Sequence, residues 1–465
     1  FDEIATVAEN LLKRPSSQQR MPARVLEDTN VGMLLSAFSS ARDPSRAWML
    51  LGSALSVGIR IDGQSLGCLM LQALPHQQAA LLATHLPAAS GCSRRDGFQV
   101  AATTAAAMLL ASSGDSSSAL SLLEPLVSEG LLDLGARRLW LACGGPEKEM
   151  GPIPVNGSSW DVRPGTPYAK EMRLLQYVLS NASPGDPASV CDAVERFGEE
   201  TLPASRRWLK VAAGRKADVL VDAAKRAPTD GIALEVGTYC GYSSTLLASV
   251  LSRPSRWGVP RVLTLEADAA HAVVAQNLIA FAGLSHAVEV LTGHSEDLLP
   301  WLAERLAGGG HHIDFAFLDQ RGSRYEADLA VLQRADLLSD GAILVADNVL
   351  KPGAPLFLWQ VSTSRAFTTE VVSVPEFAMS DVEDWMTVST YHKAYAHLSC
   401  EEAPKTVRVL EWRADQMRAR THQPQFGGGG VDFTEWSKFS QEMHLELCSV
   451  LKLQLRYYDS AGSKE

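Results

Sequence analysis

The sequence lacks any uninterrupted apolar run of about 18 residues, the length that a membrane-spanning helix requires. We therefore predict no membrane span. It also lacks a C-x-x-C pair, and its seven cysteines are scattered and odd in number. Such a pattern argues against a disulfide framework or a structural zinc site and fits a reducing compartment. We expect an intracellular, cytoplasmic location, and the sequence leaves targeting to an organelle open.

Positive charge is also scarce. The chain has 42 Lys and Arg against 53 Asp and Glu, a formal net charge of −11 at pH 7. This balance argues against a broad surface that neutralises nucleic-acid phosphates, although a local basic patch is compatible with it. At 465 residues and 46% apolar content, the chain is long enough to form two or three soluble domains.

Residues 1–145 are rich in Ala, Leu and Ser, with apolar residues at helical spacing. The segments 40–58 and 112–130 align without gaps at an offset of 72, about two helix–turn–helix units. In each segment an aspartate is placed to cap a helix and a glycine is placed to end it: Asp43 and Gly58, Asp115 and Gly130. This region resembles a short pentatricopeptide-type or tetratricopeptide-type repeat. An irregular helical bundle is the alternative.

The rest of the chain divides into a linker, an α/β domain and an extension. Residues 146–164 are dense in Gly and Pro and predict the linker. From 165 to 395, apolar runs alternate with amphipathic stretches, which indicates an α/β domain with a mostly parallel sheet. Residues 396–465 form an extension with a glycine joint and a predicted amphipathic helix over 433–455. The predicted strands are 232–236, 261–267, 287–293, 313–319, 341–347 and an antiparallel pair, 367–375 and 384–392, and helices are predicted at 268–282 and 323–335.

The stretch LEVGTYCGYSS (234–244) is a glycine-rich turn without a lysine. Ligands of parallel sheets gather at the carboxyl ends of the strands, and a phosphate would call for bare glycines and a cation there. Here an acid, Glu235, precedes the turn, and a second acid, Glu266, ends the next strand, where it could accept ribose hydroxyls. The two acids together indicate S-adenosylmethionine, whereas either alone would be read as an ordinary loop carboxylate.

A second group of polar residues follows the fourth and fifth strands. Asp319 ends one strand, and Asp347 with Asn348 ends the next. Three oxygen donors at adjacent strand ends suit a hard cation, so we predict a Mg2+ site there. A turn or a helix cap is the alternative for the Asp-Asn pair.

Several motifs follow one another as they do in the catechol O-methyltransferase family: LEVGTYCGYSS, LTLEAD, NLIAFAGL, FAFLDQRGSRY, LVADNVLKPGAP and SVPEF. The resemblance runs from residue 165 to about 392, roughly half the chain. It implies a seven-stranded Rossmann-like sheet with helices on both faces, S-adenosylmethionine as methyl donor, and Mg2+. It also implies site residues: Gly237, Tyr239, Gly241, Ser243, Ser295, Glu296 and Gln320 for the cofactor, and Glu376, Pro352 and Trp208 for the substrate.

The sequence departs from the family directly after Asp319. The family has His-Trp-Lys there, and its lysine is the general base, whereas this chain has Gln320, Arg321 and Gly322. Lys351 is a candidate replacement, because a lysine buried beside a divalent cation can give up its proton and accept another. A solvated loop lysine is the alternative reading. We expect activity to persist, because metal-bound phenols need little help from a base.

These observations predict a Mg2+- and S-adenosylmethionine-dependent O-methyltransferase acting on a catechol-like vicinal diol. The alternative is a catalytically weakened methyltransferase fold that binds the cofactor and is fused to a helical repeat. In either case the N-terminal helices could bind a protein or RNA partner. The sequence predicts no oligomeric state.

Overall fold

The computed structural model describes most of the chain from residue 61 onward. The described residues are a few positions between 35 and 54, then 61–71, 73–89, 97–132, 134–150, 168–202, 209–228, 231–251, 261–398, 401–421 and 433–458. Among them, no helix combines the length and the apolar content needed to cross a bilayer.

A twisted mixed sheet forms the centre of the α/β part. Its spatial order is β3-β2-β1-β4-β5-β7-β6-β8, with β1 to β5 parallel and β7 antiparallel to both β5 and β6. The strands are β1 (Ile232–Val236), β2 (Val262–Glu266), β3 (Val288–Thr292), β4 (Ile313–Leu318), β5 (Leu338–Ala346), β6 (Phe367–Glu376), β7 (Met379–Tyr391) and β8 (Leu455–Tyr457). The seven predicted strands are all present.

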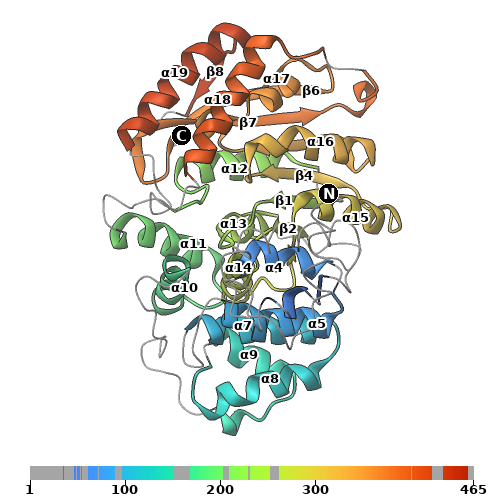
Figure 1. Ribbon diagram of the computed structural model, residues 1–465, viewed down its shortest axis with the longest axis vertical. Helices are drawn as coiled ribbons and strands as arrows, with labels where there is room; N and C mark the ends of the chain where they lie inside the picture. The colour runs from blue at the N-terminus through green and yellow to red at the C-terminus, as the bar shows by residue number, and fades with distance from the viewer. Residues whose placement is uncertain are drawn as a thin grey trace, which may run out of the picture.

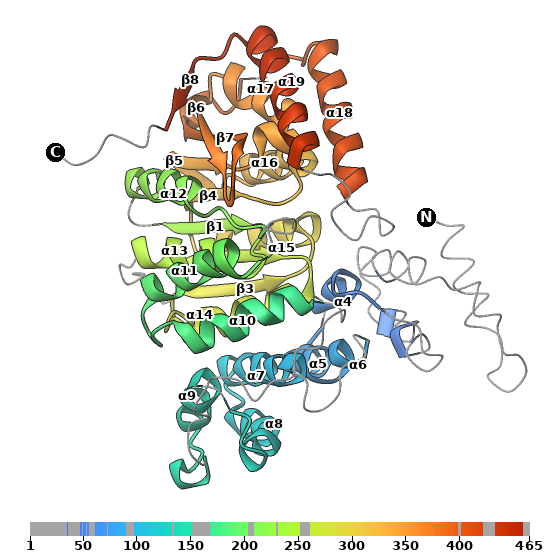
Figure 2. The same cartoon turned by 90° about the vertical axis from the view of Figure 1, so that its left-hand side faces the viewer.

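Helices cover both faces of this sheet (Figure 2). One face carries α10 (Ala169–Asn181), α11 (Pro187–Arg196), α12 (Arg215–Arg226), α13 (Tyr242–Val250) and α14 (Ala269–Phe281). The other carries α15 (Ser295–Ala307), α16 (Tyr325–Arg334), α17 (Pro355–Thr363), α18 (Lys405–Thr421) and α19 (Phe433–Leu451). Strands β1, β2 and β4 are buried on both faces, which explains their continuous apolar runs.

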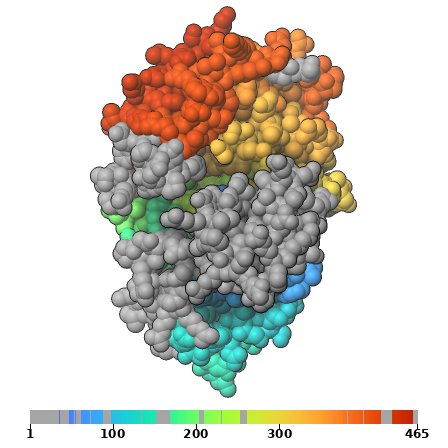
Figure 3. All heavy atoms as spheres, viewed as in Figure 1, coloured from blue at the N-terminus to red at the C-terminus, as the bar shows by residue number. Residues whose placement is uncertain are grey.

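The predicted α/β fold with a Rossmann-like sheet is confirmed, and the sheet has one strand more than the seven predicted. β8 pairs in parallel with β6, with Leu455 opposite Val371. β8 covers part of an edge that β6 would otherwise expose. It was not predicted because three residues are too few to show the alternation that marks a strand. The C-terminal residues thus return to the sheet, and they form one end of the molecule opposite the N-terminal helices (Figure 3).

The N-terminal helices pack against α14 (Figure 1), beneath the β3 edge of the sheet (Figure 2). They are α4 (Gly63–Met70), α5 (Pro75–Ala80), the π-helical turn η1 (Leu81–His85), α6 (Leu86–Ala89), α7 (Gly97–Ser112), α8 (Ser116–Ser128) and α9 (Leu134–Ala142). Asp115 caps α8 by accepting from the Ser118 N–H at 3.0 Å, and Gly130 has the predicted positive φ. The predicted cap Asp43 and the stop Gly58 lie outside the described residues, as does most of the predicted linker.

Helix α4 lies directly on the loop that follows β2. A Cβ on Gly67 would stand 2.1 Å from the carbonyl oxygen of Ala267. The Gly63 N–H donates to the Tyr168 hydroxyl at 3.1 Å, and that hydroxyl donates to Asp268 at 3.0 Å. The N-terminal helices therefore contact the same edge of the sheet at which ligands of such folds bind.

Candidate active site

The glycines of the turn after β1 are required by close backbone packing. Gly237 has a φ of +109°, and a Cβ there would lie 2.4 Å from the carbonyl oxygen of Asp319. Gly241 has a φ of +84°, and its Cβ would lie 3.1 Å from the Cβ of Ala275 in α14. Only glycine fits both the space and the backbone conformation, and the turn thereby joins the end of β1 to the end of β4.

Glu235, the acid before this turn, is fully buried. Its Oε2 accepts hydrogen bonds from the hydroxyls of Ser244 and Thr264, while Oε1 has no hydrogen-bond partner among the described residues. Burial raises the pKa of Glu235 from its ordinary value of 4.5 to about 7. An unpartnered carboxylate oxygen is costly to bury, and a cationic or hydrogen-bonding ligand would relieve that cost.

This raised pKa predicts a pH dependence of stability. The folded protein holds the Glu235 proton more tightly than the unfolded chain does, so the contribution to the free energy of unfolding is full below pH 4.5. This contribution is lost as the pH rises through 7. The folded and unfolded pKa values of Glu235 differ by about 2.5 units, which corresponds to about 3 kcal/mol. Urea unfolding of the cofactor-free protein at several pH values, compared with Glu235→Gln, should show the difference between the two proteins falling by that amount. Glu326→Gln, an exposed change on α16, is the control, and a flat difference for Glu235→Gln would contradict the assignment.

Glu266 ends β2 and is held by backbone amides. Its Oε2 accepts from the Tyr239 N–H at 2.7 Å, and its Oε1 accepts from the Asp268 N–H at 2.9 Å. The Tyr239 hydroxyl donates to Glu171 at 2.7 Å, and the Tyr239 ring packs edge-on against His271, with 4.9 Å between centroids. Each oxygen of a carboxylate can accept a second hydrogen bond, so Glu266 retains the capacity to bind two hydroxyls.

The remaining residues predicted to bind the cofactor lie at the carboxyl ends of the neighbouring strands. Ser243 is buried in the first turn of α13. The Gln320 side-chain amide donates to the Ser295 hydroxyl at 3.3 Å, which joins the residues after β3 and β4. Glu296 instead pairs with Arg324 at 3.1 Å and is half exposed. The structure thus brings Ser295 and Gln320 together and turns Glu296 toward the surface.

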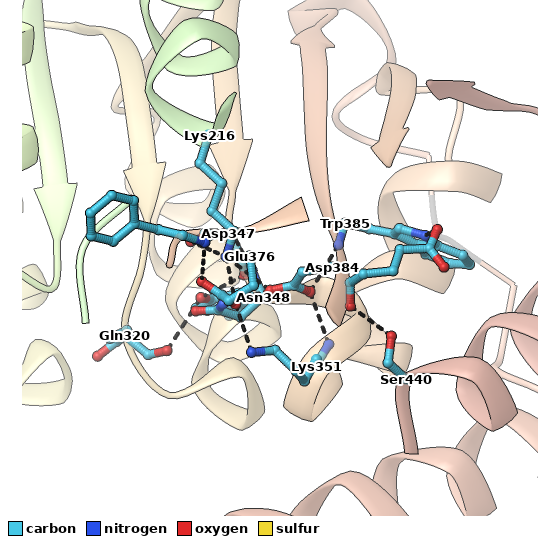
Figure 4. A network of polar contacts seen from close by, with 12 residues as sticks. Lys216, Gln320, Asp347, Asn348, Lys351, Glu376, Asp384, Trp385 and Ser440 are labelled. Atoms are coloured by element: carbon cyan, nitrogen blue, oxygen red, sulfur yellow. Dashed lines mark hydrogen bonds and ion pairs between the residues drawn. The ribbon is translucent and has the colours of Figure 1, made fainter. Parts of the chain in front are cut away.

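A buried cluster of charges stands where β5 and β6 end, beside Asp384 in β7, and Figure 4 shows Lys216 of α12 reaching into it. The Lys216 ammonium lies 2.9 Å from Asp347, 3.1 Å from Glu376 and 2.9 Å from Asp384. All four side chains are at most 7% exposed. The Asn348 amide Nδ2 donates to Asp384 at 2.7 Å, so its carbonyl oxygen Oδ1 is the atom left for another ligand.

The charged groups in this cluster shift one another's pKa values. Burial would lower the pKa of Lys216, but the carboxylates of Asp347, Asp384 and Glu376 outweigh it and raise that pKa well above 10.5. Burial raises the pKa of Asp347 to about 6, against the lowering effect of Lys216. Burial, and next the charge of Asp347, raise the pKa of Asp319 well above 3.8. Asp319 and Asp347 thus repel each other. Two acidic ligands of one cation would do the same when that cation is not bound.

The charge balance of the cluster suits a divalent cation. Four carboxylates, including Asp319, face the ammoniums of Lys216 and Lys351, which leaves two negative charges when all are ionised. Within the part of the chain that the structure describes, no three His, Cys, Asp or Glu side chains are arranged to hold a metal. A cation here would therefore need Asn348 as a ligand and would share Asp347 with Lys216.

Comparisons with known proteins identify a methyltransferase domain in this chain. Residues 234–349 match a family model described as a methyltransferase domain. Catechol O-methyltransferase from Bos taurus is 36% identical over 199 residues, which are 43% of this chain and 68% of that protein. The Mus musculus protein of the same name is 36% identical over 198 residues, 43% of this chain and 70% of its own length. The chain belongs to the catechol O-methyltransferase family. The transmembrane O-methyltransferase of Homo sapiens is also similar, at 33% identity over 225 residues, 48% of this chain and 72% of that protein.

The family resemblance inferred from the motifs is thus confirmed. The comparisons lend no support to the resemblance of the N-terminal helices to repeat proteins, which stays a prediction. The division of the chain into four parts and the roles of individual site residues also remain predictions, because sequence similarity alone does not test them.

The structure gives a physical reason for the departure from the catechol O-methyltransferase pattern after Asp319. A Cβ on Gly322 would lie 2.8 Å from the carbonyl oxygen of Gly353 and 3.0 Å from the Arg418 guanidinium. Arg418, which belongs to α18, also donates a hydrogen bond to that carbonyl. Glycine at this position therefore lets the loop before α17 and a helix of the C-terminal extension close against each other, and a lysine side chain there would displace them.

Lys351 lies inside the site and not on the solvated surface. It belongs to the short helical turn η6 (Val349–Gly353), its side chain is 3% exposed, and its Nζ lies 2.6 Å from Glu376 Oε2. Burial alone would raise the pKa of Glu376, but Lys216 and Lys351 together lower it to about 2. Pro352 follows in η6 and is partly exposed. Trp208, the last predicted substrate residue, lies outside the described residues.

Sequence reasoning missed two members of the site, Lys216 and Asp384. Lys216 stands on the buried side of α12, in line with Val219, Leu220 and Ala223. A charged residue on an apolar stripe was the signal that could have found it. Asp384 stands on β7 in alternation with the buried Met386 and Val388, which is the corresponding signal for a strand.

Proposed function

We propose that the protein transfers a methyl group from S-adenosylmethionine to one hydroxyl of a catechol-like vicinal diol, with Mg2+ as an essential ion. The family membership gives the reaction class, methyl transfer. The observation that supports the finer proposal is that Asp319 and the Asp347–Asn348 pair follow the adjacent parallel strands β4 and β5, and that the pKa values of both aspartates are raised by burial and by neighbouring acids.

The residues on the cofactor side fit the donor. The buried Glu235 oxygen without a partner and the carboxylate of Glu266 lie at the ends of adjacent parallel strands, β1 and β2. In this proposal Glu266 accepts the ribose hydroxyls, while Glu235 and the turn from Gly237 to Gly241 face the methionine part. Ser295 and Gln320 then border the adenine.

The residues on the acceptor side fit a diol. Mg2+, when bound here, would make the hydroxyl protons of a vicinal diol more acidic, and S-adenosylmethionine would supply the methyl group. Asp319, Asp347 and the Asn348 carbonyl oxygen are the ligands this chain offers. Glu376, kept ionised by two lysines, can accept a hydrogen bond from the second hydroxyl. Lys351, 2.6 Å from Glu376, is placed to take the proton of the first once its own proton has passed to water and left a neutral amine.

The test is methyl transfer by the full chain from radiolabelled S-adenosylmethionine to 3,4-dihydroxybenzoate, with 4-hydroxybenzoate as matched control acceptor. Transfer to the diol that stops with a chelator and returns with Mg2+ supports the proposal. Calorimetry with the cofactor is run beside it. Cofactor binding without transfer to any vicinal diol would favour the alternative of a binding module.

Asp319→Asn should weaken Mg2+ binding by at least about tenfold, because even partners outside a ligand set contribute about 10–100-fold to metal affinity. The change keeps the shape of the side chain and removes one of the charges that the cation would balance. The measurement is Mg2+ titration by calorimetry in the presence of S-adenosylhomocysteine, with the Mg2+ dependence of turnover as a second readout. Asp381→Asn, an exposed change, is the control. Equal Mg2+ affinity for Asp319→Asn and the control would exclude Asp319 as a ligand.

A further inference from the structure

The C-terminal extension packs directly on the acceptor side of the site. Helices α18 and α19 lie outside residues 165–392, the stretch that carries the motifs of the family, yet both contact the turn η6. Arg418 of α18 donates to the carbonyl oxygen of Gly353, the last residue of η6. From α19, the Ser440 hydroxyl donates to the carbonyl oxygen of Glu383 at 2.6 Å, next to Asp384 (Figure 4).

One residue of α19 contacts the active-site lysine itself. The Lys351 ammonium stands over the ring of Trp436, 5.0 Å from its centroid. Trp436 and Lys351 are each 3% exposed, so water is largely excluded from the pair. The same ammonium touches Glu376 at 2.6 Å, which places Lys351 between an aromatic face and a carboxylate.

This geometry restrains a side chain that is flexible by nature. A lysine has four rotatable bonds and loses much conformational freedom when it is held in one position. An aromatic face attracts the ammonium, more strongly when water is absent, and its bulk blocks the other rotamers. The indole therefore limits the Lys351 nitrogen to positions next to Glu376.

We propose that Trp436 is a positioning residue: it holds Lys351 against Glu376, so that the C-terminal extension completes the acceptor side of the active site. The proposal rests on the function proposed above, in which the neutral Lys351 amine takes the acceptor proton, and the ammonium so formed is the cation that Glu376 and the Trp436 ring hold. The C-terminal extension then positions Lys351 from another part of the chain. The loop after Asp319 cannot supply the lysine itself, because Gly322 has no side chain.

Three variants test this proposal. Trp436→Leu should lower kcat about tenfold, the scale of a desolvated cation–π contact, with unchanged KM for S-adenosylmethionine. Trp436→Phe keeps an aromatic face and should restore most of kcat. Trp412→Leu on α18 is the matched control, since Trp412 is 62% exposed, and it should stay within about twofold of the wild type. Equal kcat values for Trp436→Leu and Trp412→Leu would overturn the proposal.

A double-mutant cycle separates this inference from the proposed function. If Trp436 acts through Lys351, adding Trp436→Leu to Lys351→Met should lower kcat and the urea midpoint less than Trp436→Leu does in the wild type. Strict additivity in both would overturn the positioning role. The urea midpoints can be measured even if the wild type methylates no diol. In that case the proposed function fails, but the coupling between Trp436 and Lys351 is still tested.

Discussion

Lys216→Met should lower the free energy of unfolding by about 3–5 kcal/mol, the usual cost of removing one partner from a buried ion pair. Methionine has a similar length but leaves Asp347, Glu376 and Asp384 without the ammonium that lies within 3.1 Å of each of them. Their mutual repulsion in a buried site is then uncompensated. Urea unfolding of the cofactor-free protein, followed by circular dichroism, measures the difference.

A matched control lies on the same helix. Lys225 of α12 is 64% exposed and pairs only loosely with Asp222, at 3.7 Å, so Lys225→Met should change the free energy of unfolding by less than about 0.5 kcal/mol. If Lys216→Met does not fold, Lys216→Arg, which keeps the charge, is measured in its place. A Lys216→Met protein as stable as Lys225→Met would show that the cluster does not depend on this lysine.

The sequence predicted Asp319 and Asp347 as members of this site because strand ends can be located from apolar runs. Asp319 and Asp347 directly follow such runs, and the carboxyl ends of β4 and β5 meet at one edge because the two strands pair in parallel. Lys216 carries no such signal, because it comes from α12, and the packing of that helix on β5, β6 and β7 is a tertiary property. Local pattern alone could not place it beside Asp347.

The parts outside the family stretch were the least predictable. The helix predicted over 433–455 exists as α19, but its contact with Lys351 depends on how a segment about 80 residues further along the chain folds back. The edge strand β8 shows no alternation, and it forms because β6 offers an unpaired edge. Periodicity identifies elements, whereas the contacts between distant elements require the structure.

Both extensions contact loops at the carboxyl ends of the parallel strands. At one side, α4 lies on the loop after β2, where Gly67 meets the backbone of Ala267 next to Glu266. At the other, α18 and α19 lie on η6, which carries Lys351. The cofactor and acceptor sides of the proposed site are therefore each bordered by a region that the family stretch does not include, and acceptor choice in this chain need not follow that of its relatives.

Lys351→Met should lower kcat for methyl transfer to a diol by about 10²–10⁴-fold, the range of general base catalysis. The nitrogen of Lys351 stands beside Glu376, whereas the family position of the base is occupied by Gly322, which has no group to accept a proton. Methionine keeps the bulk against Trp436 and removes the nitrogen. Affinity for S-adenosylmethionine should stay within about twofold, because Lys351 lies on the acceptor side.

The measurement compares single-turnover rates at saturating Mg2+ and diol, so that product release does not mask the chemical step. Lys225→Met is again the control. A rate for Lys351→Met within about threefold of the wild type would mean that a metal-bound phenol loses its proton without this base, as the sequence alone suggested for a chain without the family lysine. A large loss in rate together with unchanged cofactor affinity would instead show that the lysine function has moved from the loop after β4 to the turn after β5.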